Sequence, residues 1–187
     1  MKSTPALTAA AAAFFALGVK AAPADSQTCY TVHSGYFAVH PNGGNEGVTL
    51  NQNNQVVYGQ PGTPIQVDFQ ACPTLLGNWP DEDIHIGRIL VGSDCLTIDN
   101  PDSATEPYFA SVAACSSDVT PSAGETWSYG NSDDRGVVYW RGSLDSYGHV
   151  GYIPKDSTGT PLTTADHLLE VGCDHECINF NIVAQLD

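Results

Sequence analysis

Beyond its N-terminal segment, this 187-residue chain carries its apolar residues in short bursts of period two, and helical periodicity is almost absent. Val67 and Phe69 stand between polar residues, as do Leu96 and Ile98, and a third burst runs over 180–186. Such alternation predicts strands that bury one face. Clusters of Gly, Pro, Asn and Asp separate the bursts and predict turns. The sequence therefore predicts an all-β domain.

The N-terminal segment has the pattern of a secretory signal peptide. Lys2 supplies a positive charge, residues 6–19 form an apolar run, and small residues surround the expected cleavage point at Ala21. The run is shorter than the roughly 20 apolar residues that a helix needs to span a bilayer. We therefore expect a leader over 1–21, one mature domain over 22–187, and secretion to the extracellular space.

Secretion bears on both the charge and the cysteines. The chain has 21 acidic and 6 basic residues, and two of the basic ones, Lys2 and Lys20, would leave with the leader. Such an acidic surface repels polyanions, so we expect neither nucleic acid nor a membrane surface as a partner. An oxidising compartment assigns the six cysteines to disulfides.

Three similar stretches follow one another along the chain. Each has a glycine-led strand, at Gly35, Gly87 and Gly136, and these glycines are 52 and 49 residues apart. We interpret the stretches as three repeats in one compact domain. Each glycine is followed by a strand-like segment that ends in cysteine and then by a large aromatic residue: 66–72 with Trp79, 109–115 with Trp127, and 167–173 with Phe180.

The middle repeat carries the most specific motif. It contains Gly87-Arg88-Ile89, Cys95-Leu96-Thr97-Ile98, Cys115, and Glu125-Thr126-Trp127. This order resembles the ricin B-type lectin repeat, which has a Gly-x-Ile strand, a Cys-Leu-Asp-Val strand, a second cysteine bridged to the first, and a Gln-x-Trp with a core tryptophan. The resemblance implies a β-trefoil of three repeats, a disulfide between Cys95 and Cys115, and shallow sugar sites on the outer surface. The pairing of the other four cysteines stays open: Cys29, Cys72, Cys173 and Cys177.

The sugar-binding residues of that family are not kept in this chain. Thr97 stands where the family has the Asp that accepts hydrogen bonds from sugar hydroxyls. We therefore expect the scaffold of the family with different recognition chemistry. The family's stacking aromatic is replaced by Gln70, Ala113 and Val171 in the three repeats, and its Gln by Gly77, Glu125 and Ile178.

Aromatic rings beside Asp or Asn side chains would suit a sugar site, because a ring stacks on the sugar while the polar oxygens accept its hydroxyl protons. Several tyrosines and a tryptophan cluster in the last third of the chain. The alternative is that Tyr139 or Trp140 belongs to the core, since strands are rich in aromatic residues. The ligand-binding residues that we expect are Asp99, Asn100, Asp133, Trp140, Asp145 and Tyr147.

Motifs for metal binding and catalysis are weak. The segment 173–177 lacks a second Cys/His pair at zinc spacing. The turn at 99–102 departs from the calcium-loop pattern because Pro101 occupies a ligand position. Nucleophile-elbow, zinc-protease and phosphate-loop motifs are absent. We therefore expect no metal, no cofactor and no enzymatic activity.

These observations predict a secreted, lectin-like protein whose partner is a glycan or glycoconjugate. Two alternatives stay open. One is a trefoil that binds a protein, such as a protease, through the loops at 41–47 or 156–162, as an inhibitor or effector. The other is a small glycoside-active enzyme that uses the carboxylates of Asp81, Glu82 and Asp83.

Overall fold

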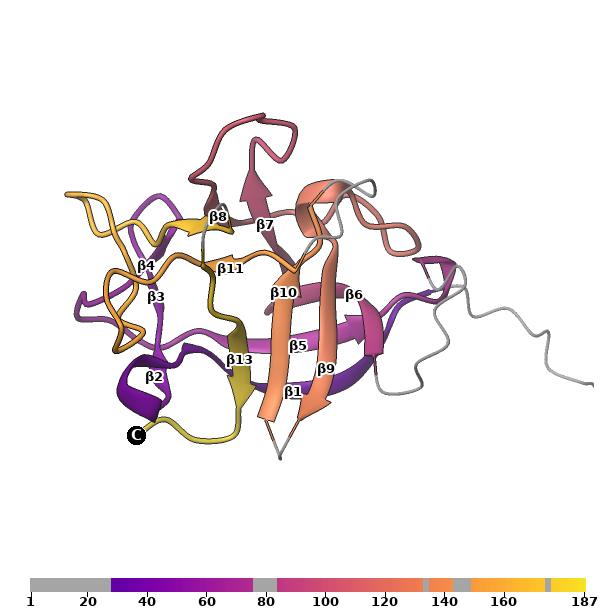
Figure 1. Ribbon diagram of the computed structural model, residues 1–187. Coiled ribbons are helices and arrows are strands. Elements are labelled where there is room, and N and C mark those ends of the chain that lie inside the picture. The colour runs from indigo at the N-terminus through magenta and orange to yellow at the C-terminus, as the bar shows by residue number, and fades with distance from the viewer. Residues whose placement is uncertain (1–27, 76–83, 133–134, 143–148, 174–175) are drawn as a thin grey trace, which may run out of the picture.

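The computed structural model describes residues 28–75, 84–132, 135–142, 149–173 and 176–187, and it confirms the all-β prediction (Figure 1). The leader predicted over 1–21 lies outside the described residues. Three short 3-10 helices interrupt the strands: η1 (Pro41–Gly43), η2 (Pro73–Leu75) and η3 (Ala123–Glu125). The strands are β1 (Tyr30–Val39), β2 (Glu46–Gly47), β3 (Thr49–Leu50), β4 (Val56–Val57), β5 (Gln66–Ala71), β6 (Ile84–Val91), β7 (Asp94–Asp99), β8 (Phe109–Ala113), β9 (Trp127–Ser132), β10 (Arg135–Trp140), β11 (Gly151–Tyr152), β12 (Val171–Gly172) and β13 (Phe180–Val183).

Six of these strands close into an antiparallel barrel. The order around the barrel is β1, β5, β6, β9, β10, β13, and β13 pairs back with β1. The order in space therefore equals the order along the chain. Figure 1 shows β9 and β10 at the front of the barrel, with β1 and β5 behind them. Closure gives each of these strands a partner on both sides.

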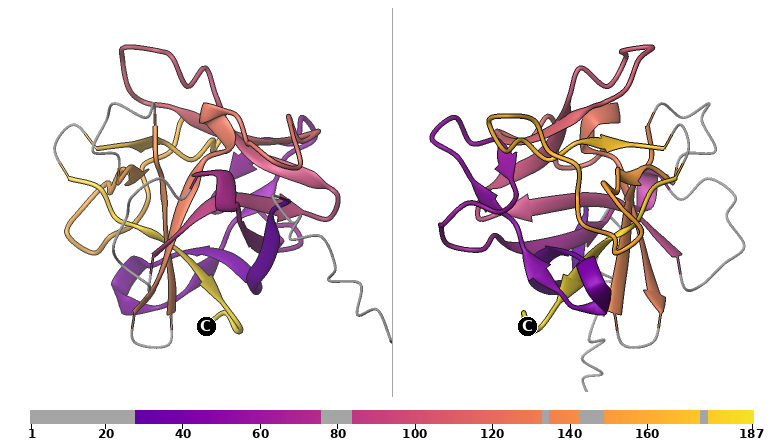
Figure 2. Two further views of the ribbon diagram at one scale, coloured as in Figure 1. Left: turned by 90° about the vertical axis from the view of Figure 1, so that its right-hand side faces the viewer. Right: turned by 60° about the vertical axis from the view of Figure 1, so that its left-hand side comes forward.

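Three hairpins interrupt the path of the chain around the barrel (Figure 2). The β3–β4 hairpin lies between β1 and β5, the β7–β8 hairpin between β6 and β9, and the β11–β12 hairpin between β10 and β13. Isolated bridges join the three hairpins to one another, so together they form one layer. These bridges pair Gln55 with Ser111, Val57 with Leu168, and Tyr108 with Val171.

The glycine-led strands are confirmed, because Gly35, Gly87 and Gly136 lie within β1, β6 and β10. At Gly87 the need for glycine is steric. A Cβ atom built there would lie 1.7 Å from the carbonyl oxygen of Gln70 on β5. The close pairing of β5 with β6 therefore excludes any larger residue at this position.

The three cysteine-ending segments are not structurally equivalent, which corrects their predicted alignment. The segments 109–115 and 167–173 contain the hairpin strands β8 and β12, whereas 66–72 contains the barrel strand β5. Both kinds of strand bury alternate residues, so the same sequence pattern fits either place. In the first stretch the second hairpin strand is β4.

The centre of the barrel is an aromatic cluster of three fully buried rings. Phe37 stacks on Phe180 with ring centroids 4.8 Å apart, and Trp127 meets both rings edge-on. The indole Nε1 of Trp127 also donates a hydrogen bond of 3.1 Å to the carbonyl oxygen of Leu96 on β7. The core role that the resemblance implies for Trp127 is thus confirmed, and this residue joins the barrel to a hairpin.

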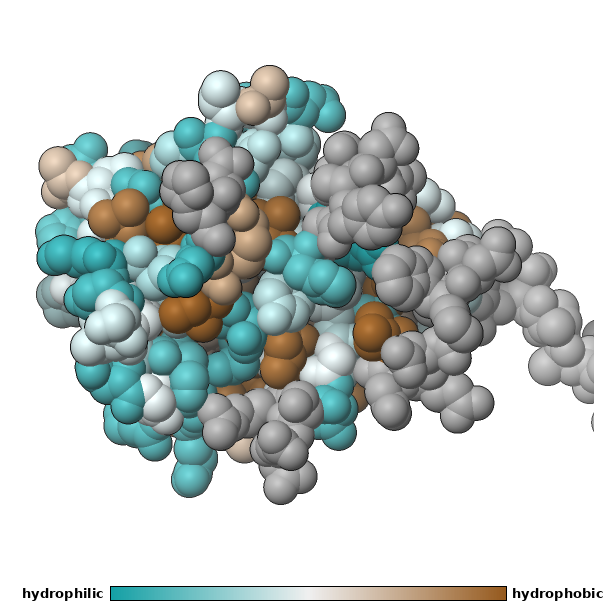
Figure 3. All heavy atoms as spheres, in the orientation of Figure 1, coloured by the Kyte–Doolittle hydropathy of each residue, from teal (hydrophilic) through white to brown (hydrophobic). Residues whose placement is uncertain are grey.

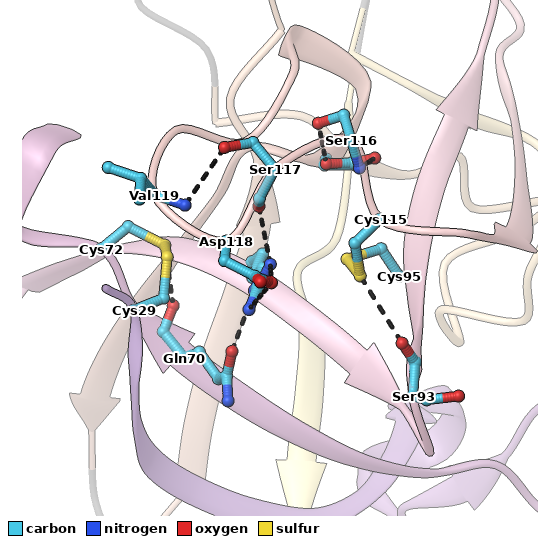
Figure 4. A network of polar contacts seen from close by, with 12 residues as sticks. Cys29, Gln70, Cys72, Ser93, Cys95, Cys115, Ser116, Ser117, Asp118 and Val119 are labelled. Carbon is cyan, nitrogen blue, oxygen red and sulfur yellow. Dashed lines mark hydrogen bonds and ion pairs between the residues drawn. A yellow bond between two sulfur atoms is a disulfide. The ribbon is translucent and has the colours of Figure 1, made fainter. Parts of the chain in front are cut away.

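Three disulfides link the chain, and the expected Cys95–Cys115 bridge is confirmed. The other two join Cys29 to Cys72 and Cys173 to Cys177. Figure 4 shows the first two bridges on either side of a polar network that includes Gln70 and Asp118. Three disulfides are typical of an oxidising, extracellular-type environment. Among the described residues, no helix is long and apolar enough to cross a bilayer.

Candidate functional site

The turn predicted at 99–102 is present, but part of its polar chemistry is used within the hairpin. Asp99 ends β7, and its Oδ1 accepts a hydrogen bond of 2.7 Å from the Ser111 hydroxyl on β8. Asn100 follows with φ of 53°, in the left-handed region that Asn tolerates in turns. Its carbonyl accepts a hydrogen bond from the Ser103 amide. Asp99 therefore holds β7 to β8.

Trp140 is a core residue, which corrects its expected role as an exposed stacking ring. Its side chain is 1% exposed, and its Nε1 donates a 2.9 Å hydrogen bond to the carbonyl oxygen of Ala123. The reason is the alternation along β10. Val138 and Trp140 point into the barrel, so Val137 and Tyr139 point outward. The outward ring of this strand is that of Tyr139.

The remaining predicted ligand-binding residues lie outside the part of the chain that the structure describes. These are Asp133, Asp145 and Tyr147. The carboxylates of Asp81, Glu82 and Asp83, on which the enzyme alternative depends, also lie outside it.

The outer wall of the barrel around β9 and β10 carries a concave surface of about 410 Å³. We name it the Tyr139 hollow. The face that carries it is mainly polar, with apolar residues visible only as small separate patches (Figure 3). The hollow is lined by Ile84, Ser128, Tyr129, Gly130, Asn131, Val137, Tyr139, His149 and Asn179.

Two rings meet at one side of the hollow. The centroids of Tyr139 and His149 lie 5.1 Å apart in a T-shaped arrangement. Burial raises the pKa of Tyr139 above the usual value of a phenol. The strand beneath is held by a 3.4 Å hydrogen bond from the Ser128 hydroxyl to the Tyr139 carbonyl. Tyr139 therefore offers a ring on a rigid strand rather than on a loop.

Two asparagines add amide groups to the hollow. Asn179 uses its Nδ2 to donate to the Asn181 side-chain oxygen at 2.8 Å and to the Phe180 carbonyl. These bonds orient the amide and leave its oxygen as an acceptor. Asn131 is exposed and adds a second amide. No carboxylate, Lys or Arg is among the described lining residues, so the hollow suits an uncharged ligand with hydroxyl groups.

A smaller cavity of about 330 Å³ lies beside the 99–102 turn, and its polar groups hold loops together. Glu106 accepts the backbone N–H of Cys173 at 2.8 Å, and the Tyr108 hydroxyl donates to the Ser103 carbonyl at 2.9 Å. These contacts fix the β7–β8 loop next to the Cys173–Cys177 bridge. We therefore attribute a structural role to them.

The loops of the protein-binding alternative pack against each other. The Asn42 amide donates to the Thr158 carbonyl at 2.6 Å, which joins the loop at 41–47 to the loop at 156–162. The second loop is a closed turn, because the backbone amide of Lys155 donates to the Thr160 carbonyl and the amide of Gly159 donates to the Asp156 carbonyl. A hydrogen bond from the Thr158 hydroxyl lowers the pKa of Asp156.

Metal binding finds no support within the described ranges, where no group of three His, Cys, Asp or Glu side chains is placed to hold an ion.

No family model, no curated protein and no solved structure matches this chain. The chemistry of the hollow is therefore the basis for an argument about function.

Tyr139 lines the hollow but is not among the ligand-binding residues that the sequence predicts. The signal that could have found it is the position of Gly136, which aligns with two other barrel glycines. Counting in twos from Gly136 places Val138 and Trp140 inside the barrel and Tyr139 outside it.

Proposed function

We propose that this protein is a secreted carbohydrate-binding protein that takes a neutral sugar residue in the Tyr139 hollow and performs no catalysis. One observation carries the proposal: the outward ring of Tyr139 lies beside His149 in a hollow whose other polar groups are mainly amides. An aromatic ring packs on the apolar C–H face of a pyranose, while amides exchange hydrogen bonds with its hydroxyls. Shallow recognition of this kind gives weak binding at a single site.

We also propose that the barrel and its three hairpins form a β-trefoil. The chain-order barrel supports this, as does the single hairpin inserted between β1 and β5, between β6 and β9, and between β10 and β13. The middle stretch supports a scaffold of the ricin B-type lectin kind, because its Cys95–Cys115 bridge and its core Trp127 agree with that resemblance.

The proposed site differs from the sugar position of that family. Glu125 replaces the family's Gln, and its carboxylate accepts hydrogen bonds from the Ser116 amide at 2.9 Å and the Ser116 hydroxyl at 2.6 Å. It thereby holds the loop that follows Cys115. With Thr97 in place of the Asp, the middle repeat lacks the family's acceptor for sugar hydroxyls. Sugar recognition in this chain would therefore use the barrel wall.

Binding of the mature protein to a glycan array and to insoluble polysaccharides tests the proposal. We expect binding by the wild type and at least a roughly tenfold loss of affinity in Tyr139→Ala, because a central aromatic anchor commonly contributes more than about 1 kcal/mol. Tyr139→Phe keeps the ring and should retain most of the affinity. Tyr30→Ala is the matched control, since Tyr30 is 50% exposed at the start of β1 and does not line the hollow.

Two outcomes would overturn the proposal. One is the absence of binding to every glycan tested. The other is an unchanged affinity of a folded Tyr139→Ala variant. Assays of the same protein against secreted proteases address the protein-binding alternative, which predicts slower hydrolysis of a protease substrate when the protein is added.

A further inference from the structure

A second concave surface lies on the wall of the barrel opposite to the Tyr139 hollow. This wall is formed by β1 and β5, and on both sides one strand separates it from β9 and β10. Figure 1 accordingly shows β9 and β10 in front and β1 and β5 behind. Two adjoining hollows of about 1090 and 600 Å³ share Tyr36, Gln66 and Ala184 among their lining residues. They form one continuous surface, which we name the Tyr36 groove.

The groove presents a ring, hydroxyls and amides beside aliphatic side chains. Tyr36 is half-buried and points outward from β1, because its neighbour Phe37 is fully buried in the barrel. Gln66, Gln185 and Thr63 line the groove with exposed polar side chains. These groups are the ones that pair with sugar hydroxyls, and the ring of Tyr36 lies among them.

The charge of the groove favours an uncharged occupant. Among the described residues that line it, Asp68 is the one carboxylate, and it accepts a hydrogen bond from the Ser34 hydroxyl. No Lys, Arg or His is among these lining residues. A charged ligand would therefore have no paired partner in most of the groove.

The closed barrel also disfavours an extended peptide as the occupant. Peptides commonly bind sheets by adding a strand to a free edge. On this wall β1 pairs with β5 and β13, and β5 pairs with β1 and β6, so neither strand is an edge strand of the sheet. Recognition in the groove therefore depends on side chains, which suits a ligand made of rings and hydroxyls.

We infer that the Tyr36 groove is a second glycan site, which takes a stretch of a neutral oligosaccharide chain, and that the protein is therefore bivalent. This inference rests on the proposed function. The Tyr139 hollow has a volume of about 410 Å³, whereas the two parts of the groove have about 1090 and 600 Å³, which gives room for a longer ligand. Because the two sites face away from each other across the barrel, one molecule joins two glycan chains instead of binding one short chain twice.

Calorimetric titration with neutral tetrasaccharides tests the second site. The probes are chitotetraose, laminaritetraose, cellotetraose and mannotetraose. For a probe that binds, we expect two sites per wild-type molecule, one site in Tyr36→Ala, one in Tyr139→Ala, and none in the double variant. Each lost site corresponds to at least a roughly tenfold weaker affinity. Tyr30→Ala is again the control, because it removes an exposed tyrosine from the same strand as Tyr36 and should keep two sites.

Light scattering tests bivalency. A soluble polysaccharide with the same linkage as the bound probe should form large complexes with the wild type and with Tyr30→Ala. Either single variant at Tyr36 or Tyr139 should bind the polysaccharide without forming such complexes. Scattering that persists in Tyr36→Ala would overturn the inference.

The outcomes separate this inference from the proposed function. Two sites in a folded Tyr36→Ala protein would reject the groove, while loss of a site in Tyr139→Ala would still support the hollow. Two sites in a folded Tyr139→Ala protein, together with loss of a site in Tyr36→Ala, would reject the hollow and support the groove. Absence of binding of every probe to the wild type would reject both. If Tyr36→Ala fails to fold, Gln66→Ala gives the same measurement, because Gln66 is exposed in the middle of the groove.

Discussion

Arg88 and Asp118 form an ion pair of 3.2 Å between a buried and an exposed side chain. The side chain of Arg88 is 7% exposed, and that of Asp118 is 83% exposed. Arg88 also donates to the Ser117 carbonyl at 2.7 Å and to the Gln70 side-chain oxygen at 2.9 Å. Figure 4 shows these acceptors between the Cys29–Cys72 and Cys95–Cys115 bridges. The guanidinium therefore holds the loop after Cys115 against β5.

Removing the two partners of this ion pair should have different effects on stability. We predict that Arg88→Met lowers the free energy of unfolding by about 2–4 kcal/mol, because partly buried acceptors lose a charged donor. Asp118→Asn should cost less than about 1 kcal/mol, because an exposed partner contributes little. Urea denaturation measures both, and equal losses would show that the ion pair itself is the main contribution.

Substitution of Gly87 should prevent the barrel from closing normally. In Gly87→Ala the new methyl group would lie 1.7 Å from the Gln70 carbonyl oxygen, so β5 and β6 must separate. We predict a loss of more than about 4 kcal/mol or failure to fold. The control is Gly92→Asn, where φ is +65° and no atom lies within 4 Å of the added Cβ. Asn tolerates this conformation, so the control should unfold near the wild-type temperature.

The three disulfides should differ in how much they stabilise the protein. Their cysteines are 43, 20 and 4 residues apart for Cys29–Cys72, Cys95–Cys115 and Cys173–Cys177. On the loop-entropy account, replacing each pair by serines should cost about 4, 3 and 2 kcal/mol in that order.

Thermal and urea unfolding of the three double-serine variants checks this order. Mass spectrometry of unreduced peptides checks the pairings themselves. A reversed order of stability would mean that native-state strain or packing outweighs the constraint on the unfolded chain.

Stability should fall in alkaline solution because three tyrosines are partly or fully buried. Burial raises the pKa of Tyr129, Tyr139 and Tyr152, and at Tyr152 the His40 amide acts in the opposite direction. A phenol whose pKa is higher in the folded state contributes stability below the unfolded pKa of about 10, and this contribution is lost as the pH rises above that value.

Two measurements check the alkaline prediction. The urea midpoint should decrease as the pH is raised above about 10, and phenolate absorbance should increase together with unfolding. In Tyr152→Phe the decrease should be smaller, although the variant is less stable at neutral pH because the His40 amide loses its acceptor. A midpoint that stays constant in alkali would argue against burial of these phenols.

Sequence alternation predicts the strands well and their places in the fold poorly. Val67 and Phe69 in β5 are buried as predicted, and so are Leu96 and Ile98 in β7. Yet β5 belongs to the barrel and β7 to a hairpin. Alternation reports only that one face of a strand is buried. The identity of the neighbouring strand depends on contacts between residues far apart in the sequence.

The candidate site shows the same limit at the level of one residue. The aromatic cluster in the last third of the chain is visible in the sequence, but Tyr139 and Trp140 are neighbours on β10 and face opposite sides. A shift of one residue in the assumed alternation exchanges core and surface. The Cys95–Cys115 bridge could be predicted from the resemblance to the ricin B-type repeat. The Cys29–Cys72 bridge was not, because its pairing depends on how β1 lies against β5.

The pairing of Tyr36 with Val183 has a consequence for how the chain folds. This contact joins the first barrel strand to the sixth, so the barrel cannot close until β13 has been added to the other five strands. Until then β1 and β10 each expose an unpaired edge, which is a template for association with other chains. Contacts this distant in sequence also slow folding. Stalled or truncated chains that lack β13 should therefore depend on chaperones to avoid aggregation.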